Sequence, residues 1–383
     1  MKILKKVKIK LKDGGIIRRF YLFKRYPIFQ HTMKNGRGHF SWFKKTNARK
    51  DQRVFYLKVN RPHCTAYQCV QQWLDIAEAV DAFCYFVCDD RKMELGIFKN
   101  VKFSNLNFRF IKSDRKTLKS TVKKVLESLS GRYWWRATYA MLTPFLHMIE
   151  HNFSSSYNID ADDLRILLAP DKIKNILQKV EEYAEEKELD CFDLDIYPTR
   201  TFGTHWSFGV VYVRTPEKCL EAIKNNKDWR RNTALIEKYK TEYVLESKWE
   251  FRNDTIDWVF SFLRDTEQLR LQTFYVENLR VVHMPDRLLD YWWPFILHWH
   301  DNNLFLPLLH EFYNEKLWGT LPIADGVVKI DVGLTDEDFY TYMHKNVPNV
   351  IKNDFFRLFI ETAKLRGKVN EDTYVKYRSA IKV

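Results

Sequence analysis

Three carboxylates stand within four positions, directly after a short apolar stretch. The segment SSSYNIDADDLRILL, residues 154–168, carries Asp160, Asp162 and Asp163 behind the strand-like SYNI. Like charges at this spacing repel, and Asp is unfavourable in strands, so the cluster needs compensation. Alternation along an extended chain puts Asp160 and Asp162 on one side. Carboxylate oxygens there suit Mg²⁺ or Mn²⁺, which would neutralise charge on a nucleoside diphosphate, whereas the alternative is an acidic helix cap.

The elements around these acids predict a mostly parallel sheet flanked by helices, an α/β fold of the Rossmann-like kind. Residues 53–60 and 81–90 have the composition of buried strands, and residues 65–80 between them have the apolar spacing of a helix. Strand, helix and strand in succession form a βαβ unit. The ligand crevice of such sheets lies at the carboxyl ends of the strands, where Asp89 and the three acids fall.

Further along the chain, the same patterns predict more helices and strands. Helices are expected at 117–129, 133–152, 170–187, 216–240 and 253–271, and the second should be kinked or broken at Pro144. Strands are expected at 190–198, 206–214 and 279–285, and the last ends near His283. The aromatic-rich stretch from 286 to 318 indicates a helical C-terminal region.

The net charge of +14 is concentrated in the first 50 residues, which hold sixteen Lys and Arg and one acid, Asp13. The rest of the chain carries 47 basic and 48 acidic residues and is close to neutral. Eight aromatic residues are interspersed among the basic ones. Such a basic aromatic N-terminal arm suits an anionic membrane surface, nucleic-acid phosphates, or simply a solvated basic face.

The cysteines and the hydropathy of the chain help to predict where in the cell the protein is located. No run reaches 18 uninterrupted apolar residues, and the start MKILKKVKIKLKDGG lacks the pattern of a secretory signal. The six cysteines include no Cys-x-x-Cys pair and predict buried, reduced thiols. Together with the arm, these features predict a cytoplasmic protein that is peripheral at the inner membrane.

The acids in their α/β setting resemble the Asp-x-Asp signature of the GT-A glycosyltransferases, here YNIDADD. FYLKVNR, residues 55–61, and DCFDLDIYPTRTFGTHWSFGVVYVR, residues 190–214, resemble a bacterial subgroup encoded among capsule and lipooligosaccharide genes. The resemblance covers residues 53–285. It implies a hexosyltransferase-like enzyme. The GT-A-like domain would span residues 51–285 and follow the arm of residues 1–50. A mainly helical region, residues 286–383, would come after it, either on the acceptor side or facing the membrane.

That resemblance also implies ligands. Asp160 and Asp162 would contact the metal, Mn²⁺ or Mg²⁺, and the ribose of the nucleotide sugar, with a UDP-sugar favoured. Asp163 is a possible third metal ligand, and His283 fits the late histidine that often returns to the metal in this family. A surface or packed histidine is the alternative for His283.

Four more residues are candidate nucleotide contacts. Asn60 and Arg61 follow the first strand of the βαβ unit, and Asp89 ends the second. Arg136 is a candidate bidentate donor to the diphosphate. For each of them, ordinary surface polarity is the alternative.

The acceptor side needs a base only if the transfer is inverting. The candidates are Asp193 and Asp195, two apart in FDLDIY, His205 in THWSFG, and Asp254 and Asp257 at a helix start, where capping is the alternative. Trp206 offers a flat face for a sugar ring. The sequence does not choose among these candidates.

Two other functions remain open at this point. One is a metal-dependent sugar-phosphate or nucleotidyl transferase that uses the same acids. The other is a nucleic-acid-binding protein that uses the arm, although the neutral body and the absence of a recognised motif argue against a nucleic-acid partner. The leading interpretation has a nucleotide sugar and a glycan or lipid-linked glycan acceptor as partners.

Overall fold

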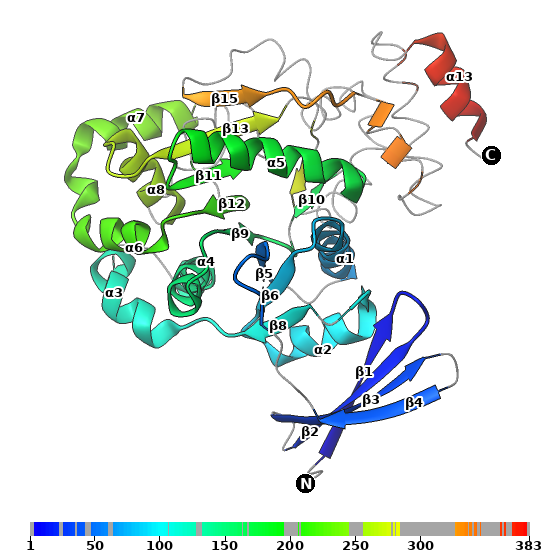
Figure 1. Cartoon of the computed structure of the whole chain (residues 1–383). Coiled ribbons are helices and arrows are strands. Elements are labelled where there is room, and N and C mark those ends of the chain that lie inside the picture. Colours follow the sequence, from blue (N-terminus) through cyan, green and yellow to red (C-terminus); the bar gives the residue numbers. More distant parts are fainter. Residues whose placement is uncertain are drawn as a thin grey trace.

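The structure is a computed structural model of the whole chain (Figure 1). It describes residues 4–22, 26–34, 37–42, 47–59, 64–105, 107–127, 132–162, 164–166, 168–194, 206, 208–244, 256–276, 279, 281–283, 326–335, 337–338, 341–342, 345, 361, 364 and 370–380.

A sheet of eight strands forms the centre of the molecule. In spatial order its strands are β15 (Val327–Ile330), β13 (Leu271–Val276), β11 (Cys191–Leu194), β12 (Val210–Val213), β9 (Ser156–Ile159), β5 (Val54–Lys58), β6 (Phe83–Val87) and β8 (Phe108–Ile111). Neighbouring strands are parallel except at β12, which is antiparallel to both β9 and β11. The α/β fold with a mostly parallel sheet is therefore confirmed.

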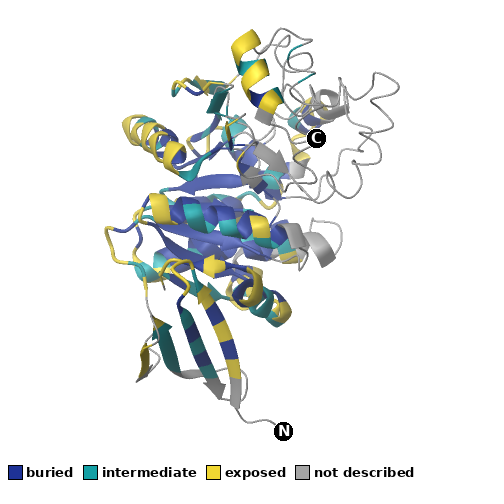
Figure 2. Cartoon of the chain, turned by 90° about the vertical axis from the view of Figure 1, so that its right-hand side faces the viewer, coloured by how far each residue is buried: buried dark blue, intermediate teal, exposed yellow. Residues whose placement is uncertain are grey.

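Helices cover both faces of this sheet and bury five neighbouring strands, β11, β12, β9, β5 and β6, completely (Figure 2). One face carries α1 (Cys64–Ala79), α2 (Arg91–Asn100) and α5 (Pro170–Glu186); the other carries α3 (Arg115–Glu127), α4 (Arg132–His151), α6 (Pro216–Asn225) and α8 (Ile256–Asp265). Each face has its own apolar core, and the alternation of side chains along each strand feeds both. β5 and β6 are five-residue strands buried at every position, as expected of parallel strands between two helical layers.

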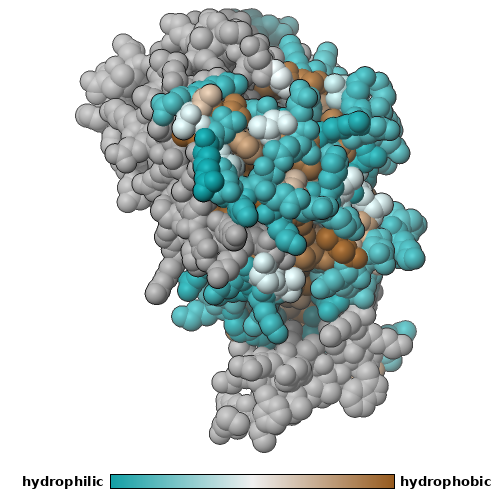
Figure 3. Space-filling model, turned by 90° about the vertical axis from the view of Figure 1, so that its left-hand side faces the viewer, coloured by the Kyte–Doolittle hydropathy of each residue, from teal (hydrophilic) through white to brown (hydrophobic). Residues whose placement is uncertain are grey.

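The remaining elements surround these three layers. They are the 3₁₀-helix Trp229–Arg231, α7 (Thr233–Val244), α13 (Glu371–Ala380) and a two-stranded sheet of β10 (Leu164–Ile166) and β14 (Val281–His283). The described surface on the side of α3, α6 and α7 is mostly hydrophilic, with smaller hydrophobic patches (Figure 3). Of the helices that the structure describes, none is long and apolar enough to span a bilayer.

The N-terminal arm is a folded sheet. β1 (Leu4–Leu11), β2 (Ile16–Leu22), β3 (Tyr26–Lys34) and β4 (Arg37–Trp42) form an antiparallel meander, and β1 also pairs with β7 (Lys102–Phe103), which follows α2. The meander lies against α2 below the main sheet (Figure 1). Sequence analysis missed these strands because frequent charges obscured the alternation of apolar residues.

Two helices differ from the expectation. The helix expected over 253–271 ends at Asp265 as α8, and residues 271–276 form the parallel strand β13. The β-branched and aromatic residues of LQTFYV are typical of a strand, but the helical spacing of the preceding residues obscured this signal. The helix expected over 216–240 is two helices, α6 and α7, with the 3₁₀-helix Trp229–Arg231 between them. α4 is not broken at Pro144, because its packing on β5, β6 and β9 offsets the lost backbone hydrogen bond. The aromatic stretch 286–318 lies outside the described residues.

The five cysteines whose side chains are described, Cys69, Cys84, Cys88, Cys191 and Cys219, are free and buried. Burial raises the pKa of the Cys88 thiol to about 12, so it stays protonated and unreactive near neutral pH. Cys191 and Cys219 lie with their Sγ atoms 3.4 Å apart between β11 and α6. The expectation of buried, reduced thiols is confirmed for these residues.

A buried histidine joins α4 to the sheet. His147 Nδ1 lies 2.8 Å from the hydroxyl of Tyr56, and the His147 ring stacks on that of His151 with centroids 4.0 Å apart. Burial, with smaller contributions from His151 and Arg109, lowers the pKa of His147 to about 3. The ring is therefore neutral at physiological pH and serves as a packing and hydrogen-bonding group.

This depressed pKa predicts a loss of stability in mild acid. Between the ordinary pKa near 6.5 and the folded value of about 3, the unfolded chain binds a proton that the folded chain does not. The free energy of unfolding should therefore fall as the pH falls below 6.5, with this group contributing about 2 kcal/mol of loss between pH 7.5 and pH 5.

Urea unfolding at the two pH values measures this effect. His147→Gln keeps a polar group at the site without titrating, and should reduce the difference between the two pH values by about that amount. His39→Gln, at an exposed position of β4, is the matched control and should leave the difference unchanged. Equal pH dependence in the wild type and His147→Gln would contradict the prediction.

Candidate functional site

The order of the strands fixes where a ligand can bind. From β5 the chain goes to β6 and then to β8 on one side, and it returns to β9 on the other side of β5. β5 and β9 are parallel and adjacent, so this reversal is a topological switch point. In open α/β sheets the ligand crevice lies outside the carboxyl ends of the two strands at such a point. Here those ends are Lys58 and Ile159.

The acids follow Ile159 directly, in a turn that hydrogen bonds hold on both sides. Asp160 N donates to Gly209 O at 2.8 Å, and Ala161 N donates to Lys58 O at 3.1 Å. Leu164 N donates back to Asp160 O at 3.1 Å and closes the turn. Asp160 is half-buried and Asp162 is 2% exposed. The prediction that the acids directly follow the carboxyl end of a strand is confirmed.

A strand from far along the chain returns to this turn. β10 begins at Leu164, and its antiparallel partner β14 pairs Leu164 with His283. The backbone of His283 thus lies across from the residue that follows the acidic segment. The strand expected over 279–285 is confirmed for Val281–His283, and it brings the late histidine to the end of the cluster.

Lys58 is a buried cation at the switch point. Its side chain is 2% exposed, and its Nζ donates a hydrogen bond of 2.8 Å to the carbonyl oxygen of Phe208. The ammonium also lies 5.9 Å from the centre of the Phe208 ring. An ammonium removed from water costs free energy unless it is hydrogen-bonded, and this contact compensates part of that cost. Lys58 therefore ties the end of β5 to the segment that precedes β12.

The same short segment is anchored from α8. Phe208 N donates to Asp257 Oδ1 at 3.0 Å, and Trp206 N donates to Ser261 Oγ at 2.8 Å. Because β12 is antiparallel to its neighbours, its start lies at the carboxyl edge, where Gly209 O accepts the bond from Asp160 N. The turn with the acids, the end of β5 and the start of α8 are thus joined through Phe208 and Gly209.

These contacts correct one expectation and qualify another. Trp206 is 0% exposed and stacks on Phe260 with ring centroids 5.6 Å apart, so it is a core residue and offers no face to a sugar. Asp257 lies in the first turn of α8, where its carboxylate accepts the Phe208 N–H. This hydrogen bond gives Asp257 a structural role. That role differs from the helix cap, which was the expected alternative to a catalytic base.

Asp89 also has a structural partner. Its Oδ1 accepts the Ser113 N–H at 2.9 Å, and its Oδ2 forms an ion pair of 2.5 Å with Arg115. The residue thus ties the end of β6 to the start of α3. The neighbouring Asp90 caps α2 by accepting the Lys92 N–H.

Arg136 is exposed near the N-terminus of α4. Asn158 Nδ2 donates to Met141 O, and Ser156 Oγ donates to Met148 Sδ, so α4 runs from the carboxyl edge of β9 toward its amino end. Arg136 precedes Met141 by more than a turn and extends beyond that edge, on the side of the acids. The amino end of α4, where the helix dipole places partial positive charge, lies at this same edge of the sheet.

The other predicted site residues are buried or undescribed. Asp193 is 1% exposed within β11, opposite Val211 and Thr273 on the neighbouring strands. The predicted residues Asn60, Arg61, Asp163, Asp195, His205 and Asp254, and the side chain of His283, lie outside the described residues.

Asp160 and Asp162 have the donor chemistry of a hard divalent cation, since both offer carboxylate oxygens. In the part of the chain that the structure describes, no group of three or more His, Cys, Asp or Glu side chains is placed to hold a metal ion. Two further ligands of the expected set, Asp163 and the His283 side chain, are not among the side chains described.

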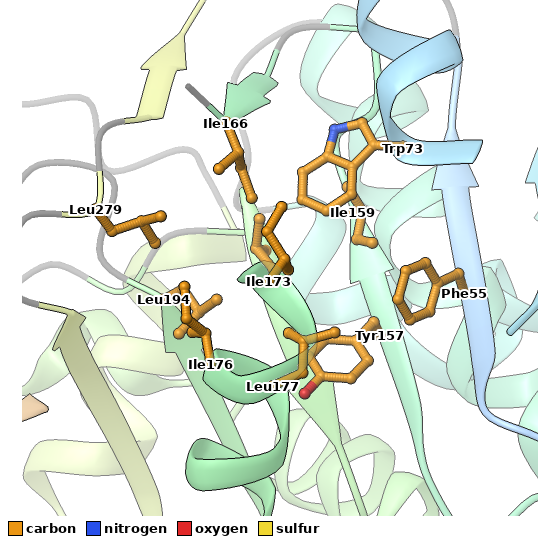
Figure 4. A pocket seen from close by; sticks show the side chains of 11 residues that line it. Phe55, Trp73, Tyr157, Ile159, Ile166, Ile173, Ile176, Leu177, Leu194 and Leu279 are labelled. Atoms are coloured by element: carbon orange, nitrogen blue, oxygen red, sulfur yellow. The ribbon is translucent and has the colours of Figure 1, made fainter. Parts of the chain in front are cut away.

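One small cavity lies beneath this edge, within the core between the sheet and α1 and α5, and its lining includes Ile159 and Val210. It has a volume of about 10 Å³ and an apolar lining that includes Phe55, Trp73, Ile159 and Leu177 (Figure 4). Two lining side chains have a polar atom: Tyr157 has its hydroxyl, and Trp73 has an indole N–H that donates to Leu164 O at 3.0 Å. A void this small and apolar is a packing gap and holds no substrate.

Sequence reasoning missed the residues that support the site. Lys58 ends an otherwise apolar strand in FYLKVN, and a lysine at the buried end of a strand was a usable signal. The backbone acceptors of Phe208 and Gly209 left no signal, since any residue type supplies a carbonyl oxygen.

No protein-family model and no curated protein sequence matches this chain. Among solved structures, the galactosyltransferase LgtC, in complex with donor and acceptor sugar analogs, aligns with a TM-score of 0.31 and 12% sequence identity. The alignment covers 78% of this chain and 99% of that one. Similarity at this level assigns neither an activity nor a site residue to the chain.

The buried Lys58 contact predicts a stability effect. Lys58→Met keeps the length of the side chain but removes the donor to Phe208 O, which would leave that carbonyl without its partner. We expect the free energy of unfolding to fall by about 1–3 kcal/mol in urea titrations. Lys174→Met, at an exposed site of α5, should change it by less than about 0.5 kcal/mol. A Lys58→Met protein more stable than the wild type would show that ammonium burial outweighs the hydrogen bond.

Proposed function

We propose that the chain is a metal-dependent glycosyltransferase of the GT-A type, which moves a sugar from a nucleotide sugar to a bacterial surface polysaccharide or lipid-linked glycan. The observation that carries the proposal is the position of Asp160 and Asp162 directly after β9, at the switch point beside β5. The crevice at this point is where α/β sheets bind nucleotides, and its acids have the chemistry to bind a cation.

In the proposed site, Asp160 and Asp162 hold Mn²⁺ or Mg²⁺, with Asp163 and His283 as further ligands. The pairing of His283 with Leu164 supports the histidine, because its backbone lies beside the acidic turn. A bound divalent cation neutralises the charge that develops on the departing nucleoside diphosphate. Asn60, Arg61 and Asp89 are proposed to contact the nucleoside of a donor that we expect to be a UDP-sugar.

The chain's own residues have three tasks in this reaction. Arg136, exposed beyond the edge of the sheet near the amino end of α4, adds positive charge for the diphosphate. Lys58 and Gly209 keep the acidic turn in position through their backbone and side-chain hydrogen bonds. Asp193, Asp195 and His205 remain the proposed candidates for an acceptor-side base if the sugar is transferred with inversion.

Calorimetric titration of UDP, GDP and CMP, with and without Mn²⁺, tests the donor site. One nucleotide should bind in a Mn²⁺-dependent manner, and Asp162→Asn, a near-isosteric change that removes the charge, should weaken that binding at least tenfold. Asp171→Asn, on the exposed first turn of α5, removes the same charge elsewhere and should bind like the wild type.

Nucleotide binding that is independent of both Mn²⁺ and Asp162 would contradict the metal site. The mass of the product from a nucleotide-sugar donor distinguishes the reactions. An acceptor that gains a sugar alone supports glycosyl transfer, whereas a gain of phosphate supports the alternative of a sugar-phosphate or nucleotidyl transferase.

The hydrogen bond between Asp257 and Phe208 supports a positioning role for this acid in place of proton transfer. Asp257→Asn keeps an oxygen acceptor for the Phe208 N–H but cannot take a proton. We expect it to lower kcat less than tenfold, whereas Asp257→Leu, which loses the acceptor, should lower stability and kcat together. A kcat that falls by a factor of 100 or more in a fully folded Asp257→Asn protein would identify Asp257 as the base.

A further inference from the structure

The N-terminal meander has two unlike faces, because side chains alternate along each strand. Val7, Ile9 and Ile17 are buried and join the core that contains α2 and β7. The alternate residues of β1, Lys6, Lys8 and Lys10, are exposed on the opposite face. Figure 2 shows buried and exposed residues alternating along a strand of this N-terminal sheet. Packing against the main domain therefore uses one face of the meander, and the other is directed outward.

The outward face continues across β2, β3 and β4 through the register of the strands. Lys8 pairs with Arg18, Arg18 with His31, and His31 with Phe40. In the next row, Lys10 pairs with Ile16, and Ile16 with Met33. We call this surface the basic face and define it by Lys6, Lys8, Lys10, Ile16, Arg18, His31, Met33 and Phe40.

The cations of the basic face differ from two neighbouring lysines, Lys12 and Lys34, in having no acidic partner among the described residues. Lys12 forms an ion pair with Asp75 at 2.9 Å and also contacts Glu78, and Lys34 forms one with Asp13 at 2.8 Å. Lys6, Lys8, Lys10 and Arg18 form no ion pair with any residue that the structure describes. Asp13, the one acid among the first 50 residues, is thus occupied elsewhere, and no acid that the structure describes pairs with the cations of the basic face.

Apolar side chains lie beside these cations. Phe40 is 62% exposed, the most exposed large hydrophobic residue described, and it stacks on His31 with ring centroids 4.1 Å apart. Ile16 and Met33 are half-buried and adjacent in the sheet. An exposed aromatic ring on the same face as unpaired lysines is costly to leave in water and suits a boundary between apolar and charged surroundings.

We propose that the basic face docks on the surface of an anionic lipid bilayer. The lysines and Arg18 would meet acidic headgroups, and Phe40, Ile16 and Met33 would enter the interfacial region. A nucleic acid would also attract the lysines. The aliphatic side chains favour the bilayer, however, since they gain free energy on leaving water and have no π-face for a base to stack on.

Vesicle sedimentation with the full chain tests this surface. The probes are vesicles of phosphatidylcholine with about a third phosphatidylglycerol, and vesicles of phosphatidylcholine alone. Lys6→Gln/Lys8→Gln/Lys10→Gln removes three charges at exposed strand positions. At roughly fivefold per lysine, binding to the anionic vesicles should fall about a hundredfold, and wild-type binding should weaken as salt is raised. Phe40→Thr should also weaken binding, with no change of charge.

The matched control is Lys174→Gln/Lys224→Gln/Lys227→Gln, which removes three exposed lysines from α5, from α6 and from the turn after α6. It has the same net charge as the test variant and should bind like the wild type. Circular dichroism and thermal unfolding check that all variants are folded. Equal losses in the two triple variants, or equal binding to neutral and anionic vesicles, would overturn the proposal.

A short DNA duplex and a single strand of the same length complete the experiment. DNA binding that the Lys6→Gln/Lys8→Gln/Lys10→Gln variant loses, without vesicle binding by the wild type, would assign the face to nucleic acid and overturn the proposal. The proposal is independent of the transfer reaction. Nucleotide titration of the same triple variant should match the wild type, so failure at the membrane and failure at the donor site are separable.

Discussion

The candidate site depends on keeping charged groups at the ends of buried strands. Lys58 ends β5 with an almost fully buried ammonium, and the turn after β9 contains Asp160 and Asp162. Charges at such positions are tolerated only where polar groups surround them. The carbonyl oxygens of Phe208 and Gly209 supply part of that surrounding, one accepting from the Lys58 ammonium and the other from the Asp160 N–H.

This arrangement explains why β12 is reversed in an otherwise parallel sheet. A parallel strand at that position would begin at the opposite edge, and the segment before it would lie far from the acids. As an antiparallel strand, β12 starts beside the end of β9, with Val210 paired to Ile159. Its leading residues then reach both Lys58 and α8. The single reversal therefore brings a third segment of the chain to the switch point.

The sequence predicted the parts of the fold in which local patterns are unambiguous. β5, α1 and β6 are apolar at the periods of their elements, and β9 with its acids is recognisable because charge follows directly on an apolar run. The pairing of β10 with β14 was not predictable, because it joins two three-residue strands that are over a hundred residues apart. The burial of Trp206 was missed for a similar reason, since Phe260, on which it packs, belongs to a distant helix.

The switch point also has a consequence for synthesis of the protein. β5 pairs with β6 within 30 residues, but its other edge pairs with β9, about 100 residues further along the chain. At typical rates of about 5–20 residues per second, that edge waits roughly 5–20 seconds on the ribosome for its partner. During this interval a strand of the sequence VFYLK has unpaired backbone groups on one side. An inner strand of the finished sheet is thus an open edge during translation, and a chaperone that shields nascent strands could bind there.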